Sequence, residues 1–400
     1  MIPFFLLPFW LLFALPEAPA QEPYRRMLDN PLEFHGPELM SGLPSEVEQI
    51  RIGLFAPAGP THAVGQAIIR GASLALEEAN AQGGYQGTPF VLVQRWADDP
   101  WGAGSKEVIR LVYEDRVWAV IGSIDGESTH VAQQIVTKAF LPLLSPVSSD
   151  PSLTHIRIPW IFRLPPDDRA QAAALLKQGV GERGLKRVGL IFASNHDGRM
   201  AAAEWESVMA ARGVPPVFHL PVSPASEDFF EAVRHTRSFS PDGLAVYLPR
   251  KGLLALLQAL REEGMNVTVL IPWIPGLERS ELEAAYPAGT LIQATPFPLH
   301  KVCGPYWKFT RNYIHCFGER PPDPAAYAYD AARMVIEGIR REGLNRSGLW
   351  EAITRLAPYP GITGSIIWDN GGGNTAAPDV EILQAGSMPS IPAEPSRESP

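Results

Sequence analysis

From about Gln49 onward, short apolar runs alternate with longer stretches in which apolar residues recur at helical spacing. The short runs predict β-strands and the longer stretches predict amphipathic helices. The predicted strands are Ile50–Ala56, Phe90–Arg95, Val117–Gly122, Leu141–Ser145, Arg187–Ala193, Gly243–Leu248, Val267–Pro272 and Thr290–Ala294. The predicted helices are His62–Asn80, Ser105–Asp115, Ser128–Phe140, Arg169–Glu182, Met200–Arg212, Glu227–Thr236 and Lys251–Glu263.

This alternation predicts an α/β fold. Strands that alternate with helices of this length form βαβ units and parallel sheets. The strands are nearly continuous apolar runs, which is typical of sheets covered by helices on both faces. Because these units outnumber what one doubly wound sheet usually holds, we expect two α/β lobes.

The N-terminus has the pattern of an export signal. An apolar core over residues 2–15 is followed by Ala18-Pro19-Ala20, a small-x-small cleavage pattern before Gln21. No lysine or arginine precedes the core, so an uncleaved anchor remains the alternative. We expect a signal peptide over residues 1–20 and a periplasmic or secreted protein.

Two other segments lack apolar periodicity. Residues 21–48 predict an irregular N-terminal arm, and the proline-containing residues 386–400 predict a disordered tail. No apolar run of 18 residues occurs after residue 20, so we do not expect the mature chain to span a membrane.

Charge and composition exclude several function classes. The 34 Lys and Arg against 43 Asp and Glu give a net charge of −9, which disfavours binding to nucleic acid or anionic lipid. The sequence has no P-loop, no H-E-x-x-H and no C-x-x-C, and its 9 histidines follow no metal-binding spacing. We therefore expect no metal and no cofactor.

The 2 cysteines, Cys303 and Cys316, are separated by a helix-like pattern in which Pro305 begins and Gly318 ends the helix. A helix of that length rises roughly 20 Å, whereas bridged Cα atoms lie within ~7 Å. We expect two unpaired thiols unless Cys303 folds back before the helix.

Several short motifs, taken in order, resemble the leucine/isoleucine/valine-binding branch of the type I periplasmic solute-binding proteins. The resemblance covers roughly residues 49–385. The motifs are Gly59-Pro60-Thr61, the helix end over residues 71–84, Asp98-Asp99, Val120-Ile121-Gly122 leading to Ser128-Thr129, residues 145–154, Phe162-Arg163, residues 327–332, and Trp368-Asp369-Asn370-Gly371.

The resemblance implies two Rossmann-like lobes joined by three crossing strands, which close on a ligand by a hinge motion. It assigns residues 49–164 and 298–358 to lobe one, and residues 165–297 and 359–385 to lobe two. The crossings are expected near Leu164, Phe297 and Tyr359. The partners it implies are a small-molecule ligand and the permease subunits of an ABC transporter.

Two lobe-one loops follow strands and are expected to hold the ligand. The first leads into a helix whose unpaired N–H groups would attract a ligand carboxylate; its candidates are Gly126, Glu127, Ser128 and Thr129. Ser128 could instead only cap the helix. In the second loop, the resemblance assigns ligand contacts to Val147, Ser148 and Ser149, although an ordinary Ser/Pro turn is the alternative.

The remaining candidates depart from the family's pattern. Gly126 aligns where the family has Ser, Asp197 and Arg250 align with family aromatics, and Trp273-Ile274 aligns with a family carboxylate. His62 lies at the expected cleft mouth, although a surface position is its alternative. The site expected for a plain aliphatic amino acid is therefore not intact.

Three functions are compatible with the sequence. The first is a non-catalytic solute receptor for an ABC importer, which captures a small polar, amino-acid-like ligand. The second is the ligand-sensing subunit of a signalling system. The third is a serine hydrolase, because Gly126-Glu127-Ser128 faintly resembles a nucleophile elbow, although His130 replaces its final glycine. We expect the receptor rather than an enzyme.

Overall fold

The computed structural model describes residues 47–287, 289–295, 297 and 304–384. The strands are β1 (Ile50–Phe55), β2 (Phe90–Arg95), β3 (Val120–Gly122), β4 (Leu143–Ser145), β5 (Ile161–Arg163), β6 (Val188–Ala193), β7 (His219–Val222), β8 (Gly243–Tyr247), β9 (Thr268–Ile271), β10 (Thr290–Thr295), β11 (Tyr359–Gly361), β12 (Gly364–Ile366) and β13 (Asp379–Leu383).

The α-helices are α2 (Ala63–Ala81), α3 (Ser105–Ile109), α4 (Gly126–Lys138), α5 (Ser152–His155), α6 (Asp168–Leu176), α7 (His196–Ala211), α8 (Phe230–Phe239), α9 (Arg250–Glu262), α10 (Arg279–Ala285), α11 (Gly304–Phe317), α12 (Asp323–Glu342) and α13 (Arg346–Leu356). Wider π-helical turns extend α3 and α6: η1 (Pro100–Gly104), η2 (Arg110–Glu114) and η3 (Lys177–Glu182).

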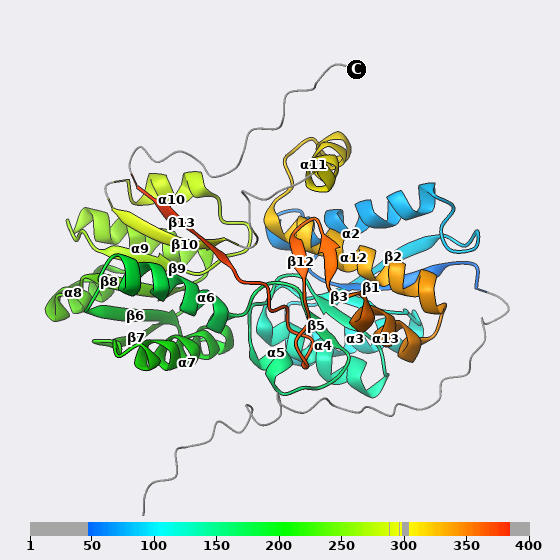
Figure 1. The fold of residues 1–400 in the computed structure, drawn as a ribbon, viewed down its shortest axis with the longest axis horizontal. Helices are drawn as coiled ribbons and strands as arrows, with labels where there is room; N and C mark the ends of the chain where they lie inside the picture. The colour runs from blue at the N-terminus through cyan, green and yellow to red at the C-terminus, as the bar shows by residue number, and fades with distance from the viewer. Residues whose placement is uncertain (1–46, 288, 296, 298–303, 385–400) are drawn as a thin grey trace, which may run out of the picture.

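These elements form two α/β lobes that lie side by side (Figure 1). Lobe one contains a sheet of order β2-β1-β3-β4-β5, and lobe two contains a sheet of order β13-β10-β9-β8-β6-β7. All neighbours in the two sheets are parallel except β10 and β13. The predicted α/β fold with two lobes is confirmed.

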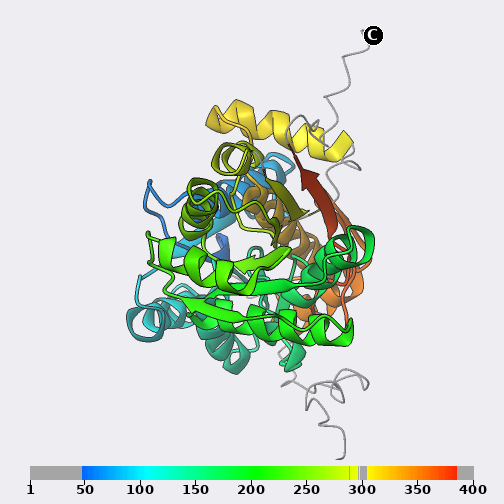
Figure 2. The same ribbon diagram turned by 90° about the vertical axis from the view of Figure 1, so that its left-hand side faces the viewer.

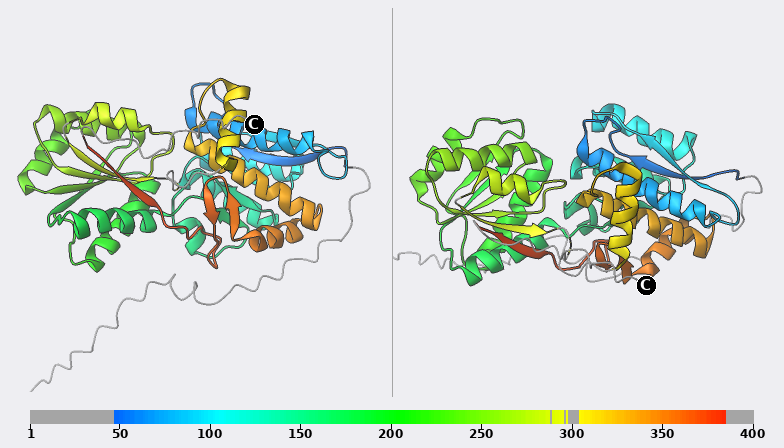
Figure 3. Two further views of the ribbon diagram at one scale, coloured as in Figure 1. Left: turned by 45° about the horizontal axis from the view of Figure 1, so that its top comes forward. Right: turned by 90° about the horizontal axis from the view of Figure 1, so that it is seen from above.

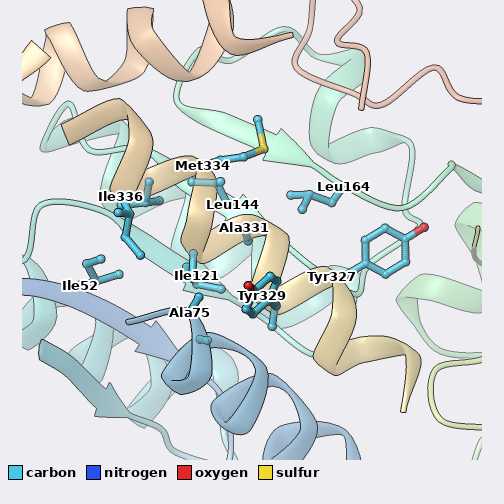
Figure 4. Close-up of a cluster of buried hydrophobic side chains, with 14 of the residues drawn as sticks. Ile52, Ala75, Ile121, Leu144, Leu164, Tyr327, Tyr329, Ala331, Met334 and Ile336 are labelled. Atoms are coloured by element: carbon cyan, nitrogen blue, oxygen red, sulfur yellow. The ribbon is translucent and has the colours of Figure 1, made fainter. Parts of the chain in front are cut away.

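Helices cover both faces of the lobe-one sheet, as the apolar strands predicted. On one face, Ile52 of β1 and Ile121 of β3 pack against α2 and α12 (Figure 4). Gly71 of α2 lies against the backbone of Ala325 in α12, where a Cβ atom would come within 2.1 Å of the Ala325 carbonyl oxygen. On the other face, the core joins the strands to the helical segment over residues 100–114 and to α4.

Lobe two repeats this layered arrangement, as the view from its end shows (Figure 2). Residues of β6, β8 and β9 pack on one face against α8, α9 and α10. The other face packs against α6 and α7, with the buried Trp205 of α7 among the core side chains.

The chain passes between the lobes at three places (Figure 3). It leaves lobe one after β5 and returns after β10, where Phe297 already packs in the lobe-one core. The third passage follows Asn374, later than the expected position near Tyr359. Tyr359, Ile362 and Ile366 pack in the lobe-one core, and only β13 joins the lobe-two sheet.

A buried carboxylate fixes this late segment to lobe one. Asp330 of α12 accepts hydrogen bonds from the backbone N–H groups of Ile362 (2.9 Å) and Thr363 (2.9 Å), and from the Thr363 hydroxyl (2.7 Å). Tyr327 and Tyr329 of the same helix are buried in the core.

Two expectations concern segments only partly described. Cys316 is exposed on α11, whereas Cys303 lies outside the described residues, so the pairing of the two thiols stays a prediction. The signal peptide, the N-terminal arm and the C-terminal tail also lie outside them, apart from residues 47 and 48. Among the described helices, we find none with the length and apolarity that a membrane crossing requires.

Candidate functional site

A cavity of about 330 Å³ lies between the two lobes. It is lined by segments that follow the carboxyl ends of strands, where open α/β sheets bind their ligands. The lining residues are His62, Ala63, Val64, Ile124, Asp125, Val147, Ser148 and Ser149 from lobe one, and Ala193, Asn195, Asp197, Tyr247, Leu248, Pro249, Arg250, Pro272, Trp273, Ile274, Pro275 and Gly276 from lobe two. The volume suits a small molecule.

The lobe-one wall contains the N-terminus of α4, which begins earlier than predicted. Asp125 is the N-cap, and its carboxylate accepts a hydrogen bond from the Ser128 backbone N–H (2.8 Å). The buried Ser128 hydroxyl also donates to this carboxylate. The prediction that Ser128 begins or caps the helix is therefore wrong, because the aspartate three residues earlier performs that role.

The four candidates of the first loop do not line the cavity. Thr129 is buried, and its hydroxyl donates to the Asp125 carbonyl oxygen (2.5 Å). Glu127 instead accepts a hydrogen bond from the indole of Trp101 (2.9 Å), an exposed side chain. Gly126 contributes its backbone N–H, which donates to the carboxylate of Asp197 across the lobe junction (3.1 Å).

The second loop lies at the cavity, and its contacts with a ligand stay a prediction. Val147, Ser148 and Ser149 all line the cavity and are buried. The Ser148 hydroxyl accepts a hydrogen bond from the Asp150 backbone N–H (3.2 Å), and the Ser149 carbonyl oxygen accepts one from the Asp168 backbone N–H (2.9 Å). These residues belong to the lobe-one wall of the cavity.

Asp197 is the principal acidic group of the lobe-two wall. One of its oxygens accepts the Gly126 N–H, and the other has no hydrogen-bond partner among the described residues. Burial, together with the nearby carboxylates of Asp125 and Asp150, raises the pKa of Asp197 to about 7. A positively charged ligand group beside Asp197 would therefore stabilise its ionised carboxylate.

Asp168 and Tyr247 lie beside it, and the sequence analysis missed both. Asp168 is 1% exposed, and neither of its carboxylate oxygens accepts a well-aligned hydrogen bond from the described residues. Burial and the carboxylates of Asp150 and Asp197 raise its pKa well above the usual range, although the Ser149 hydroxyl partly offsets this. The pKa of Tyr247 is raised too, by burial and by Asp168.

The other predicted residues line the cavity but are held by protein partners. The Arg250 guanidinium Nε lies 3.2 Å from a carboxylate oxygen of Glu281. The indole of the buried Trp273 donates to Asp323 of α12 across the junction (3.3 Å). His62 caps α2, because its Nδ1 accepts a hydrogen bond from the Gly65 N–H (3.1 Å).

At the edge of the junction, the carboxylate of Asp150 lies between two imidazoles. His196 Nε2 of lobe two lies 2.8 Å from Asp150 Oδ2, and His130 Nε2 of lobe one lies 3.3 Å from the same oxygen. Although burial acts in the opposite direction, the hydrogen bonds from His130 and His196 lower the pKa of Asp150. The hydrogen bond with Asp150 in turn raises the pKa of His196.

The chain is similar in sequence to known proteins. Residues 49–387 match the profile of a family described as periplasmic binding protein. An amino acid binding protein of Pseudomonas aeruginosa is 24% identical over 80% of this chain and 86% of that protein. Leu/Ile/Val-binding protein homolog 3 of Brucella melitensis is 26% identical over 74% and 79%, respectively.

A solved structure has the same fold. The branched-chain amino acid transporter substrate-binding protein LivJ of Streptococcus pneumoniae, in complex with isoleucine, superimposes with a TM-score of 0.74 at 21% identity, and covers 85% of this chain and 97% of that one. Together, the two-lobed fold, the interlobe cavity and the profile match identify the chain as a member of the periplasmic binding protein family, within the type I branch that includes the Leu/Ile/Val-binding proteins.

Proposed function

We propose that the protein is an exported receptor that captures a small polar solute between its lobes and delivers it to an ABC importer. The observation that carries this proposal is the cavity lined from both lobes, with the Asp197 carboxyl facing it from lobe two. Such an arrangement couples ligand binding to lobe closure, because a ligand that contacts both walls stabilises the closed form.

We further propose that the solute carries a protonated amine. At the N-terminus of α4, where a ligand carboxylate would be favoured, Asp125 and Asp197 already accept the backbone N–H groups. A second carboxylate there would be repelled, whereas an ammonium group would relieve the repulsion between Asp197 and its acidic neighbours.

Two alternatives are weighed against this proposal. A sensing receptor would use the same cavity, and only the identity of its protein partner separates it from a transport receptor. A serine hydrolase is disfavoured, because the Ser128 hydroxyl is buried and bonded to Asp125. Ser152 does contact His130 Nε2 (2.8 Å), but Gln133 rather than a carboxylate holds the opposite ring nitrogen (3.1 Å).

A thermal-shift screen tests the proposed ligand class. The probes are agmatine, an alkyl diamine, isoleucine and benzoate, each in large excess over the protein. We expect the two amine probes to raise the melting temperature, because a ligand that binds only the folded state stabilises it by mass action. Isoleucine carries both an ammonium group and a carboxylate, so its effect shows whether the cavity also accepts a carboxylate. Stabilisation by benzoate but by none of the three probes that carry an ammonium group would contradict the amine assignment while leaving the receptor role intact.

The double variant S148A/S149A tests the location of the site. We expect it to weaken binding of the best probe, because each lost hydrogen bond to a charged ligand costs ~1.5–3 kcal/mol. Because the Ser148 hydroxyl also accepts the Asp150 backbone N–H, the variant should melt at a lower temperature without ligand as well. Calorimetric titration measures the affinity. The control is S238A, whose hydroxyl is exposed on α8 away from the cavity. Equal affinities for the wild type and both variants would show that the ligand binds elsewhere.

A further inference from the structure

We propose that His130, Asp150 and His196 form a binding site for a divalent transition-metal ion of the Zn²⁺ class at the edge of the lobe junction. One ligand atom from each of the three side chains lies within 4.8 Å of the other two. The site is separate from the solute cavity, since none of the three residues lines it. The proposal therefore does not depend on which solute the cavity binds.

The distances suit a tetrahedral ion. Zinc binds imidazole nitrogen and carboxylate oxygen at about 2.0–2.1 Å, so neighbouring ligand atoms in a tetrahedron lie ~3.4 Å apart. Asp150 Oδ2 lies 3.3 Å from His130 Nε2 and 2.8 Å from His196 Nε2. To bind an ion, the His196 ring would move outward from Asp150, and the two imidazole nitrogens, which lie within 4.8 Å of each other, would take up the same spacing. A fourth coordination position would remain for water.

The surrounding groups orient the three ligands as they are oriented in metal sites. The Gln133 amide donates to the Leu153 carbonyl oxygen (3.0 Å), which directs its own oxygen toward His130 Nδ1 (3.1 Å). When an ion binds, that contact holds the ring N–H on Nδ1, so that Nε2, which without the ion faces Asp150 Oδ2 and Ser152 Oγ (2.8 Å), becomes the ligand atom. The backbone N–H and hydroxyl of Ser152 donate to Asp150 Oδ1 (2.8 and 2.7 Å), which leaves Oδ2 for the ion.

The charges around the three side chains and their exposure to solvent also favour a metal ion. The Asp150 carboxylate is 2% exposed, whereas His130 and His196 retain side-chain exposures of 19% and 29%, so an ion can enter from the imidazole side. The negative charges of Asp197 and Glu127 also act on His196. Two imidazoles with one carboxylate favour zinc, cobalt, nickel or copper over magnesium and calcium, which prefer all-oxygen sites.

No spacing motif in the sequence indicates this site, because its three ligands lie far apart in the chain. His130 and Asp150 belong to different segments of lobe one, and His196 begins α7 in lobe two. The sequence-based expectation of no metal site considered only ligands close together in the chain. The fold brings the three together across the junction, so a bound ion would link the lobes directly.

Metal titration of the mature, tag-free protein after chelator treatment tests the site. We expect one equivalent of Zn²⁺ to bind by calorimetry, and one equivalent of Co²⁺ to give the visible absorption of a tetrahedral complex. H130Q, H196Q and D150N should each weaken Zn²⁺ binding at least ~10-fold. The control H219Q removes a histidine of β7, away from the site, that forms an ion pair with Glu206 (2.7 Å), and should bind like the wild type.

Clear results would overturn the proposal. They are less than one equivalent bound by the wild type, a Co²⁺ spectrum of an octahedral complex with water, or unchanged affinity in the three ligand variants. The Co²⁺ measurement uses the wild-type protein, so it remains decisive if a variant fails to fold. Loss of metal binding in H196Q with unchanged solute affinity would separate this site from the solute cavity.

Discussion

At the scale of single residues, the chemistry of the cavity depends on carboxyl groups that form no ion pair within the described part of the chain. Asp197 and Asp168 both have raised pKa values, because burial and neighbouring acids disfavour their charged forms. A folded protein that holds such groups gives up stability to do so. Groups kept at that cost mark candidate binding sites.

The variant D197N should separate stability from binding. The folded-state pKa of Asp197, about 7, lies above its usual value of 3.8, so the folded protein binds the proton more tightly than the unfolded chain. Its destabilising effect is therefore absent below the usual value, grows as the pH rises toward 7, and is complete above that pH. The asparagine oxygen can still accept the Gly126 N–H, so we expect D197N to melt a few degrees higher than the wild type at pH 8.

The same variant should bind the best amine probe at least ~10-fold more weakly, since a charged hydrogen bond is lost. Melting curves at pH 4.5 and pH 8 and calorimetric titration provide the two readouts. The control is E227Q, which neutralises an exposed carboxyl outside the cavity. If D197N melts at a lower temperature than the wild type at pH 8, ionised Asp197 does not destabilise the folded protein.

The sequence predicted part of this site. Ser148, Ser149 and Asp197 line the cavity, since residues after strand ends must meet at one sheet edge. Asp125 could have been found, because aspartate is among the residues preferred at the N-cap of a helix. The burial of Asp168 beside the cavity could not, since it depends on contacts between lobes that no local pattern encodes.

At the scale of elements, lobe one depends on the close approach of α2 and α12. Gly71 lies where these helices touch, and an added Cβ would come within 2.1 Å of the Ala325 carbonyl oxygen. Packed interiors do not absorb such an overlap without movement of the backbone. The glycine is thus required by packing rather than by an unusual backbone angle.

We expect G71A to destabilise the protein by ~1–3 kcal/mol, the usual cost of overpacking. Urea denaturation monitored by circular dichroism measures the change. G59A is the matched control, because a Cβ there meets no atom within 4 Å, and its midpoint should stay close to that of the wild type. A G71A midpoint equal to that of G59A would show that the two helices are not packed as described.

The sequence predicted the central strands of both sheets well and most of the edge strands poorly. Apolar runs identified β1, β6 and β8 to within a residue, because both of their sheet neighbours are present and both faces are covered. They also identified the edge strand β2, which begins at the buried Phe90. The edge strand β7 alternates exposed and half-buried residues, and β5 has only 3 residues. β13 lies far along the chain from its partner β10, so only the folded topology reveals their antiparallel pairing.

At the scale of the whole molecule, pH should change how firmly the lobes are held together. The raised pKa of His196 means that its contribution is complete below the usual histidine value of ~6.5 and is lost as the pH rises through the raised value. The lowered pKa of Asp150 means that its contribution is complete above ~4 and is lost on further acidification. The ion pair between His196 and Asp150 is therefore strongest between about pH 4 and 6.5.

Above that range, the ionised Asp197 adds repulsion toward Asp125 and Asp150. With a chelator present, we expect X-ray scattering to show a larger radius of gyration at pH 8.5 than at pH 5.5. H196Q should remove much of this difference, whereas the junction-remote H219Q should retain it. A radius that does not change with pH in the wild type would refute this reading of the junction.

The discontinuity of lobe one has a consequence for how the protein is made. The partner of α2 is α12, and the whole first passage through lobe two separates them in the chain. A nascent polypeptide must therefore carry the uncovered apolar side of its first helix through most of translation, a situation that favours aggregation or chaperone capture. Shortened genes that stop before codon 323 should yield insoluble product rather than a smaller receptor.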